Sequence, residues 1–96
     1  KKEGRIITVA GCAGGRDSSK RKDIGKIVSD FSDIAIFTKD DPRYENINNI
    51  FSDMTKNINK KNYILIKNRK KAIYKAYAGK SRHIDIILFK MKHVKT

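Results

Sequence analysis

The sequence has little of the residues on which several common kinds of site depend. It contains one cysteine, Cys12, so an intramolecular disulfide is impossible, and only two histidines. His83 and His93 lack cysteine or carboxylate partners at metal-ligand spacing, which disfavours a zinc site. No apolar run approaches the about 20 residues that span a bilayer, and no basic-then-apolar leader opens the chain. We therefore expect no bound metal, no membrane partner and a cytoplasmic setting.

The length of 96 residues fits one domain, which we expect to span residues 1–96 without an internal boundary. A chain of this size is too small for two lobes that close over a substrate. It begins at Lys1 rather than at a methionine, which suggests a segment excised from a longer protein. If the chain belongs to an enzyme, we expect it to be one piece of that enzyme.

Basic residues far outnumber acidic ones. The sequence has 23 Lys and Arg against 10 Asp and Glu, a formal net charge of +13. Such an excess is typical of proteins that bind nucleic acid, because lysine and arginine release counterions from phosphates. The lysines are nevertheless spread along every segment, and the tyrosines form no evident platform on which bases would stack. We therefore expect no nucleic-acid partner. A basic α/β nucleic-acid-binding module is kept as the alternative function.

Short apolar runs rich in β-branched residues predict buried strands. They are Ile6–Val9, Ile34–Phe37, Tyr63–Ile66 and Ile84–Phe89. Each run is followed by a polar stretch or by a segment with a different apolar period.

The segments between these runs have the spacing of amphipathic helices. The apolar positions of the first segment are Ile24, Ile27, Val28 and Phe31, and those of the second are Ile47, Ile50, Phe51, Met54 and Ile58. A third helix is predicted from Arg69 to about Ala78, with Asn68 as its N-cap. Strands that alternate with helices predict an α/β fold, a small Rossmann-like domain. We expect a mostly parallel sheet of about four strands with helices on both faces.

A glycine-rich loop follows the first predicted strand, with the sequence Gly11-Cys12-Ala13-Gly14-Gly15-Arg16-Asp17. Glycines between a strand and a helix leave backbone N–H groups open to an anion, and Arg16 offers a guanidinium suited to a carboxylate. Ser18 or Ser19 can cap the helix that begins near Lys20. The alternative is an ordinary tight turn whose glycines only satisfy the backbone geometry. The loop is not a dinucleotide-binding motif, because the G-x-G-x-x-G spacing is absent. For Cys12 we favour a small packed residue over a reactive thiol.

A second loop, Asp40-Asp41-Pro42-Arg43, follows the second predicted strand. Carboxyl ends of parallel strands meet at one edge of a sheet, so both loops should lie together where such sheets bind ligands. Pro42 fixes its own backbone and restricts Asp41, which holds Asp41 and Arg43 in a defined relation. An acid and a guanidinium in this relation suit a zwitterion such as an amino acid. The alternative is a helix-initiating turn.

The first loop and the residues after it resemble a known motif. Residues 11–25 are similar to the G-C-x-G-x-R-D-x-x-K-R-x-x-M-G pattern that opens the C-terminal domain of Mur ligases of the UDP-N-acetylmuramoyl-tripeptide synthetase type. That family has D-[ND]-P-R after the next strand, often followed by an acidic residue, and the pattern appears here as Asp40-Asp41-Pro42-Arg43-Tyr44-Glu45. The resemblance covers roughly Arg5 to Phe89.

This resemblance implies a domain of an ATP-dependent amide ligase that adds a diamino acid to UDP-N-acetylmuramoyl-L-alanyl-D-glutamate in peptidoglycan synthesis. The domain would deliver the diamino acid and be inactive alone, with ATP and Mg²⁺ held outside this chain by a central domain of the same protein. Arg16 would contact a carboxylate of the diamino acid, and Asp40, Asp41, Pro42 and Arg43 would recognise its far end. Asp41 stands in place of the asparagine usual with diaminopimelate, which leaves diaminopimelate, lysine and related diamino acids open.

The end of the chain departs from the family pattern. Mur ligases of this type carry G-K-G-H-E after the fourth strand, where this chain has Lys90, Met91, Lys92, His93 and Val94. Only the histidine is retained, so part of the expected grip on the amino acid is altered. Two alternatives to a Mur ligase domain are kept. They are the nucleic-acid-binding module and a stand-alone Rossmann-like domain.

Overall fold

The computed structural model describes residues 5–14, 19–40, 44–78 and 84–90, with side chains excluded for Arg5 and for residues 84–90. Strands and helices alternate along the chain. In order they are β1 (Arg5–Cys12), α1 (Arg21–Phe31), β2 (Ile34–Lys39), α2 (Ile47–Thr55), β3 (Tyr63–Ile66), α3 (Arg69–Ala78) and β4 (Ile84–Lys90).

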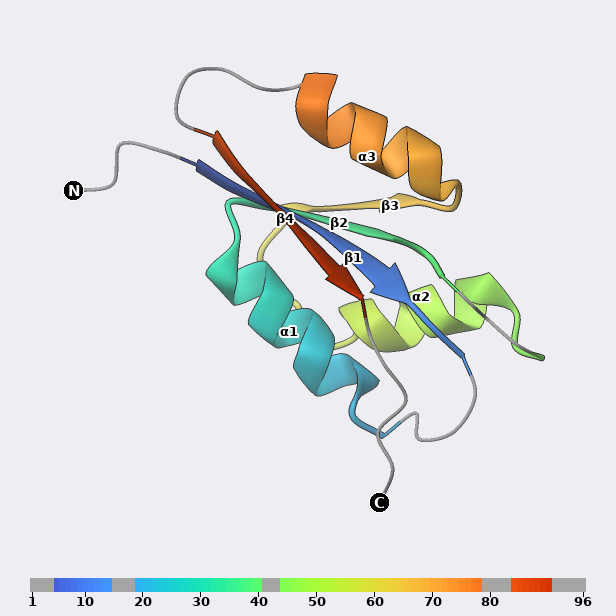
Figure 1. Ribbon diagram of the computed structural model, residues 1–96. Helices are drawn as coiled ribbons and strands as arrows, with labels where there is room; N and C mark the ends of the chain where they lie inside the picture. Colours follow the sequence, from blue (N-terminus) through green and yellow to red (C-terminus); the bar gives the residue numbers. More distant parts are fainter. Residues whose placement is uncertain (1–4, 15–18, 41–43, 79–83, 91–96) are drawn as a thin grey trace.

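The strands form one parallel sheet in the order β3-β2-β1-β4. Val9 at the centre of β1 is paired with Ile36 of β2 on one side and with Leu88 of β4 on the other. Helices α1 and α2 cover one face and α3 covers the opposite face (Figure 1). The predicted fold class, including the four parallel strands and the helices on both faces, is confirmed.

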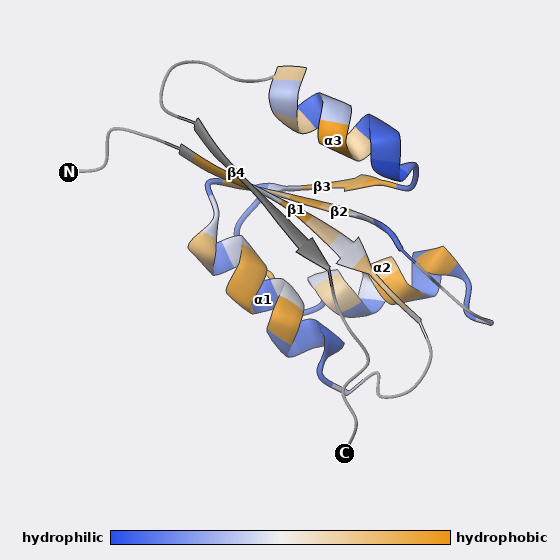
Figure 2. Ribbon diagram, in the orientation of Figure 1, coloured by the Kyte–Doolittle hydropathy of each residue, from blue (hydrophilic) through white to orange (hydrophobic). Residues whose placement is uncertain are grey.

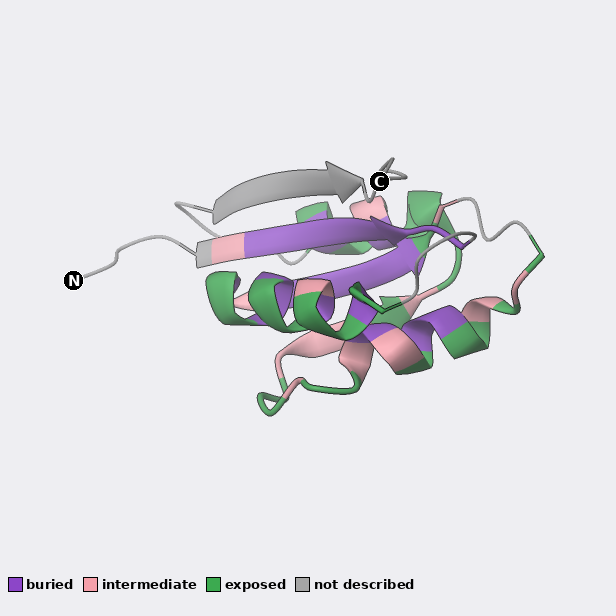
Figure 3. Cartoon of the chain, turned by 90° about the horizontal axis from the view of Figure 1, so that it is seen from below, coloured by how far each residue is buried: buried purple, intermediate pink, exposed green. Residues whose placement is uncertain are grey.

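The side chains of β1 alternate between two hydrophobic layers, as the two-residue period of a strand requires. Ala10 and Cys12 pack toward α1 and α2 together with Phe37, whereas Ile7 and Val9 pack toward α3. Apolar residues accordingly dominate β1, β2 and β3, while the helices carry both polar and apolar residues (Figure 2). The middle of the sheet is buried between the helix layers (Figure 3). This rigid centre fixes the positions at which the loops leave the sheet.

Side-chain caps start two of the helices. Asn46 Oδ1 accepts a hydrogen bond from the N–H of Asn48 at 2.8 Å, and Asn68 Oδ1 accepts one from Lys71 at 3.0 Å. The predicted cap Asn68 is thus confirmed. The prediction for α1 is wrong as regards Ser19, because Lys20 occupies the N-cap position and makes no side-chain capping bond. Ser18 lies outside the described residues.

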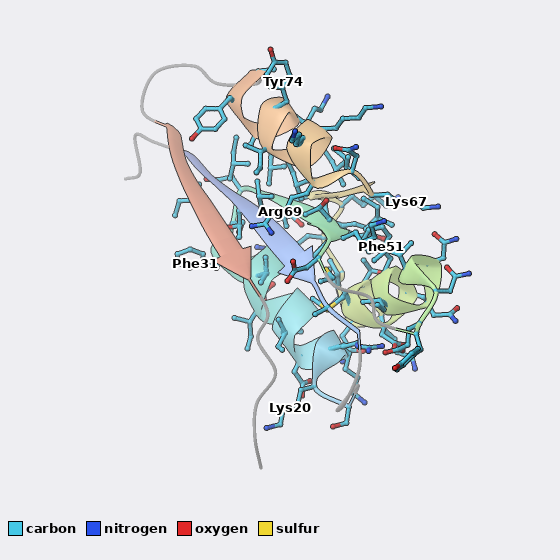
Figure 4. All side chains as sticks on the ribbon, turned by 45° about the vertical axis from the view of Figure 1, so that its right-hand side comes forward. Lys20, Phe31, Phe51, Lys67, Arg69 and Tyr74 are labelled. Atoms are coloured by element: carbon cyan, nitrogen blue, oxygen red, sulfur yellow. The ribbon has the colours of Figure 1, made fainter. Side chains whose placement is uncertain are left out.

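The inward face of α1 differs from the apolar pattern of its sequence. Val28 is buried as predicted, but Ile27 is 66% exposed and Phe31 is 57% exposed. The buried face instead includes Arg21 and Gly25, because α1 packs closely against α2 at the glycine. Figure 4 shows Phe31 on the side of the view opposite α2. Apolar spacing alone therefore predicted the existence of the helix but misjudged its orientation.

Helix α2 is one turn shorter than the apolar pattern predicts. It ends at Thr55, whose hydroxyl donates back to the carbonyl oxygen of Phe51 at 3.0 Å. A hydroxyl that bonds the preceding turn competes with continued helix. Ile58 lies beyond the helix yet still packs against the hydrophobic layer beneath α1 and α2. No helix in the described part of the chain is long and apolar enough to cross a membrane.

Candidate functional site at the carboxyl ends of β1 and β2

The two loops singled out in the sequence leave the sheet side by side. Cys12, the last residue of β1, is in register with Lys39, the last residue of β2. The N–H of Asp40 donates to the carbonyl oxygen of Cys12 at 3.0 Å, so this pairing extends into the second loop. Gly14 in the first loop is buried. The expected meeting of both loops at one edge of the sheet holds for the described residues where the loops begin.

The two loops also end side by side, where each enters its helix. Arg21 is the first residue of α1, and Glu45 lies two residues before α2. The Arg21 guanidinium donates through Nη1 to Glu45 Oε2 at 3.0 Å and through Nη2 to the second oxygen of the same carboxylate. This is the two-pronged geometry that arginine, and not lysine, can make with a carboxylate.

A second carboxylate contacts the same guanidinium. Nη1 of Arg21 donates to Asp53 Oδ2 on α2 at 3.0 Å. The Arg21 side chain is only 2% exposed, whereas those of Glu45 and Asp53 are 33% and 40% exposed. The hydrogen bond that Arg21 donates to Glu45 is the largest of the causes that raise the pKa of Arg21 above its usual range, and the bond donated to Asp53 acts in the same direction against desolvation. The buried guanidinium therefore keeps its charge.

Nε of Arg21 is buried and has no hydrogen-bond partner within the part of the chain that the structure describes. Next to this cluster lies a hollow of about 180 Å³, lined by Ser19, Lys22, Asp53 and Lys56. Lys22 and Lys56 give Asp53 a cationic neighbourhood on its open side. Glu45 and Asp53 thus share one arginine, and Asp53 also lies beside the two lysines that line the hollow.

Asp40 is the one predicted site residue that the structure describes. Its side chain is 13% exposed, and its Oδ1 accepts from Nη1 of Arg69 at 3.4 Å. Arg69 is the first residue of α3, on the other face of the sheet. Asp40 is therefore held at the end of β2 by contacts to both neighbouring elements. Its place at the sheet edge agrees with the sequence prediction, whereas the contact with Arg69 was not foreseen.

Several predicted residues lie outside the described residues. They are Arg16, Asp41, Pro42 and Arg43 of the two loops, His83, and residues 91–94 of the altered tail. Their roles stay predictions. Sequence reasoning also missed the cluster of Arg21, Glu45 and Asp53, although Arg21 and Glu45 both fall within the quoted motifs. From the sequence alone, a basic residue such as Arg21 at the start of a helix is expected to be exposed to solvent. Its burial follows from contacts with carboxylates that are distant in the sequence.

Cys12 is a packed residue at the base of the first loop, as favoured from the sequence. Its side chain is fully buried, and its Sγ lies 3.6 Å from the carbonyl oxygen of Ala10. Burial raises the pKa of the Cys12 thiol to about 12, and a hydrogen bond with the backbone of Thr38 opposes this more weakly. The thiolate, which is the nucleophilic form, is therefore scarce at neutral pH.

This burial predicts an unreactive thiol in the folded chain. At pH 8 the thiolate fraction should be about a thousandfold below that of an exposed cysteine, so alkylation by iodoacetamide should be correspondingly slow. Mass spectrometry of the native and urea-unfolded chain measures the two rates. Equal rates would contradict a buried Cys12.

Among the described residues, no group of three or more His, Cys, Asp or Glu side chains could hold a metal ion. What the described residues of the site offer is a fixed sheet edge and charged side chains. These features can bind and orient a charged ligand.

A scan of family models matches residues 1–93 to the family described as Mur ligase, glutamate ligase domain. This match spans nearly the whole chain. The chain belongs to the Mur ligase family.

Mur ligase relatives agree with this assignment. The chain is 44% identical over 86 residues to UDP-N-acetylmuramoyl-L-alanyl-D-glutamate--2,6-diaminopimelate ligase 1 of Clostridium acetobutylicum, which covers 90% of this chain and 18% of that protein. It is 49% identical over 72 residues to the corresponding ligase of Clostridium perfringens, over 75% of this chain and 15% of the relative. The resemblance stated from the loop motifs is confirmed.

A solved structure of a UDP-N-acetylmuramoyl-L-alanyl-D-glutamate--2,6-diaminopimelate ligase matches this Mur ligase chain with a TM-score of 0.76 and 31% identity. The match covers 90% of this chain and 18% of the solved one. The chain therefore spans less than a fifth of the length of these relatives, and it has the fold of the corresponding part.

Proposed function

We propose that this chain is the C-terminal, amino-acid-binding domain of a longer ATP-dependent ligase that adds a diamino acid to UDP-N-acetylmuramoyl-L-alanyl-D-glutamate. The observation that carries the proposal is the family match over residues 1–93. The names of the relatives, which specify 2,6-diaminopimelate, support the choice of substrate. On this proposal residues 1–96 form one domain of the protein, and the whole ligase works in the cytoplasm in peptidoglycan synthesis.

The proposed role of this domain is to hold the incoming diamino acid. Arg16 contacts one of its carboxylates, and the loop from Asp40 to Arg43 recognises its far end. The contacts of Asp40 with Cys12 and Arg69 support this assignment, because they hold the start of the loop in place. A substrate whose two ends are both fixed presents its amino group in one orientation, which favours attack on an activated carboxylate.

ATP and Mg²⁺ are proposed to bind a central domain outside this chain. There ATP supplies the activation of the acceptor carboxylate, and this chain contributes the nucleophile by positioning the diamino acid. The central domain is accordingly the proposed protein partner. Its contacts with this chain bring the two substrates together, so the isolated chain is expected to have no ligase activity.

Among diamino acids we propose diaminopimelate, because it is the substrate in the names of the relatives. Its far end carries both an ammonium and a carboxylate, which suits a loop that offers aspartates and Arg43. Lysine lacks the far carboxylate and so lacks the partner for a guanidinium in that loop. Asp41 stands in place of the asparagine usual with diaminopimelate. Binding of lysine must therefore be compared with binding of diaminopimelate.

The ¹⁵N-labelled chain titrated with diaminopimelate, lysine and ATP tests this proposal by NMR. Diaminopimelate is expected to bind with a dissociation constant of the order of 1 mM, since an isolated domain lacks the contacts of the whole enzyme. The largest shifts are expected at Gly14, Ser19, Asp40 and Glu45. Lysine should bind more weakly and ATP should leave these signals unchanged.

Nucleic acid provides the contrasting ligand in this titration. Weak attraction that disappears at near-physiological salt is expected from the net charge of +13 alone. Tight binding of an oligonucleotide at that salt, with no response to diaminopimelate, would contradict the proposed function.

A further inference from the structure

The two loops of the candidate site are joined at both ends. At their beginnings, the N–H of Asp40 donates to the carbonyl oxygen of Cys12 at 3.0 Å. At their ends, the guanidinium of Arg21 binds both oxygens of Glu45. Arg21 follows the first loop directly and Glu45 follows Arg43 by two residues. The pairing at the beginnings is an extension of the sheet, whereas the pairing at the ends includes the ion pair between Arg21 and Glu45.

We propose that the Arg21–Glu45 ion pair positions the two loops for the diamino acid, so that Arg21 and Glu45 are positioning residues of the ligase. The proposal rests on the function proposed above and goes beyond it, because neither residue is required to touch the substrate. The ion pair fixes Arg21, which follows the first loop, beside Glu45, which follows the second.

The placement of Arg21 in the helix layer explains how one side chain does this. Gly25, one turn later in α1, lets α1 approach the backbone of Met54 in α2. This approach buries Arg21 and brings Asp53, the neighbour of Met54, within 3.0 Å of Nη1. Asp53 therefore fixes the guanidinium to α2, while Nη1 and Nη2 both donate to Glu45. The contact with α2 thus fixes Arg21, and Arg21 in turn fixes the position of Glu45.

The two carboxylates consequently have different expected roles. Asp53 lies within α2, and its loss removes a contact between two helices. Glu45 lies between Arg43 and α2 in the sequence, and its loss removes the contact of this segment with Arg21. A merely structural role for Arg21 would make the two carboxylates equivalent for substrate affinity. Positioning of the loops makes them different.

The test uses a chimera, the Clostridium acetobutylicum ligase in which the matched segment is replaced by that of this chain. Glu45→Gln preserves the shape of the side chain and removes its charge. It is expected to raise the KM for diaminopimelate about tenfold, with the KM for ATP and kcat within about twofold of the wild-type chimera. Asp53→Asn is expected to lower the thermal midpoint yet leave the KM for diaminopimelate within about twofold.

A second variant gives the same information by another route. Arg21→Lys keeps the positive charge but loses the two-pronged contact, and it should raise the KM for diaminopimelate as much as Glu45→Gln does. Because both substitutions break one contact, the double variant should show no further increase. Lys26→Gln is the matched control, since Lys26 forms an exposed ion pair with Asp30 on the same helix at 2.8 Å. It should leave every kinetic constant unchanged.

Equal changes in KM from Glu45→Gln and Asp53→Asn would overturn the positioning role, as would an unchanged KM for diaminopimelate in both Glu45→Gln and Arg21→Lys. These outcomes leave the proposed function intact, because the wild-type chimera still forms product. A folded wild-type chimera that forms no product with any diamino acid would count against the proposed function itself. The two failures are thereby distinguished.

Discussion

Replacement of Gly25 by alanine is expected to lower the free energy of unfolding by about 3 kcal/mol or more. An ideal Cβ at Gly25 would lie 1.7 Å from the carbonyl oxygen of Met54 and 2.7 Å from its carbonyl carbon. Both atoms belong to the backbone of α2, so no side-chain rotation relieves the overlap and the two helices must separate. In an open helix the same substitution would stabilise by about 1 kcal/mol, because alanine has the higher helix propensity. The overlap with Met54 therefore makes the change in the free energy of unfolding destabilising.

Urea denaturation of the full chain, followed by circular dichroism, measures this effect. Ile27→Ala is the matched control, because Ile27 lies on the same helix and is 66% exposed. That control should change the free energy of unfolding by no more than about 0.5 kcal/mol. A Gly25→Ala chain as stable as the wild type would show that α1 and α2 do not approach each other at this point.

Removal of the guanidinium of Arg43 is expected to have the largest effect on substrate affinity. In the chimera, Arg43→Ala should raise the KM for diaminopimelate roughly 10- to 100-fold, the effect expected when the proposed charge-assisted hydrogen bond to a carboxylate is lost. The KM for ATP should stay within about twofold, because ATP is proposed to bind another domain. The expectation follows from the position of Arg43 in the loop that begins at Asp40 at the sheet edge.

Lys39→Ala provides the control for loss of positive charge near this loop. Lys39 is the last residue of β2 and is exposed, so its removal should change neither KM by more than about twofold. Steady-state kinetics with each substrate varied in turn separates the two constants. If Arg43→Ala raised both KM values equally, the residue would act on the enzyme as a whole and not on the diamino acid.

The strands and the order of elements followed from local sequence patterns. The buried runs at Ile6–Val9 and Ile34–Phe37 are both extended by the sheet, and the predicted cap at Asn68 is present. These features depend on neighbours a few residues apart, which a sequence displays directly. The meeting of the two loops at one sheet edge where they begin then followed from the parallel topology alone.

The arrangement around Arg21 could not be predicted in this way. Its partners Glu45 and Asp53 are 24 and 32 residues away in the sequence, on elements whose relative placement the sequence does not display. Apolar spacing suggested that Ile27 faces inward, whereas the approach at Gly25 turns Arg21 inward instead. A glycine within an amphipathic helix, next to charged residues, was the available signal of a close crossing.

The wild-type chimera provides the most direct measurement of the central claim, that this chain holds the diamino acid of a Mur ligase. Its rate of amide formation with UDP-N-acetylmuramoyl-L-alanyl-D-glutamate, ATP and diaminopimelate can be followed by chromatography of the product. The account predicts product formation that saturates with diaminopimelate and is weaker with lysine. A folded chimera that still binds ATP but forms no product with either diamino acid would contradict it.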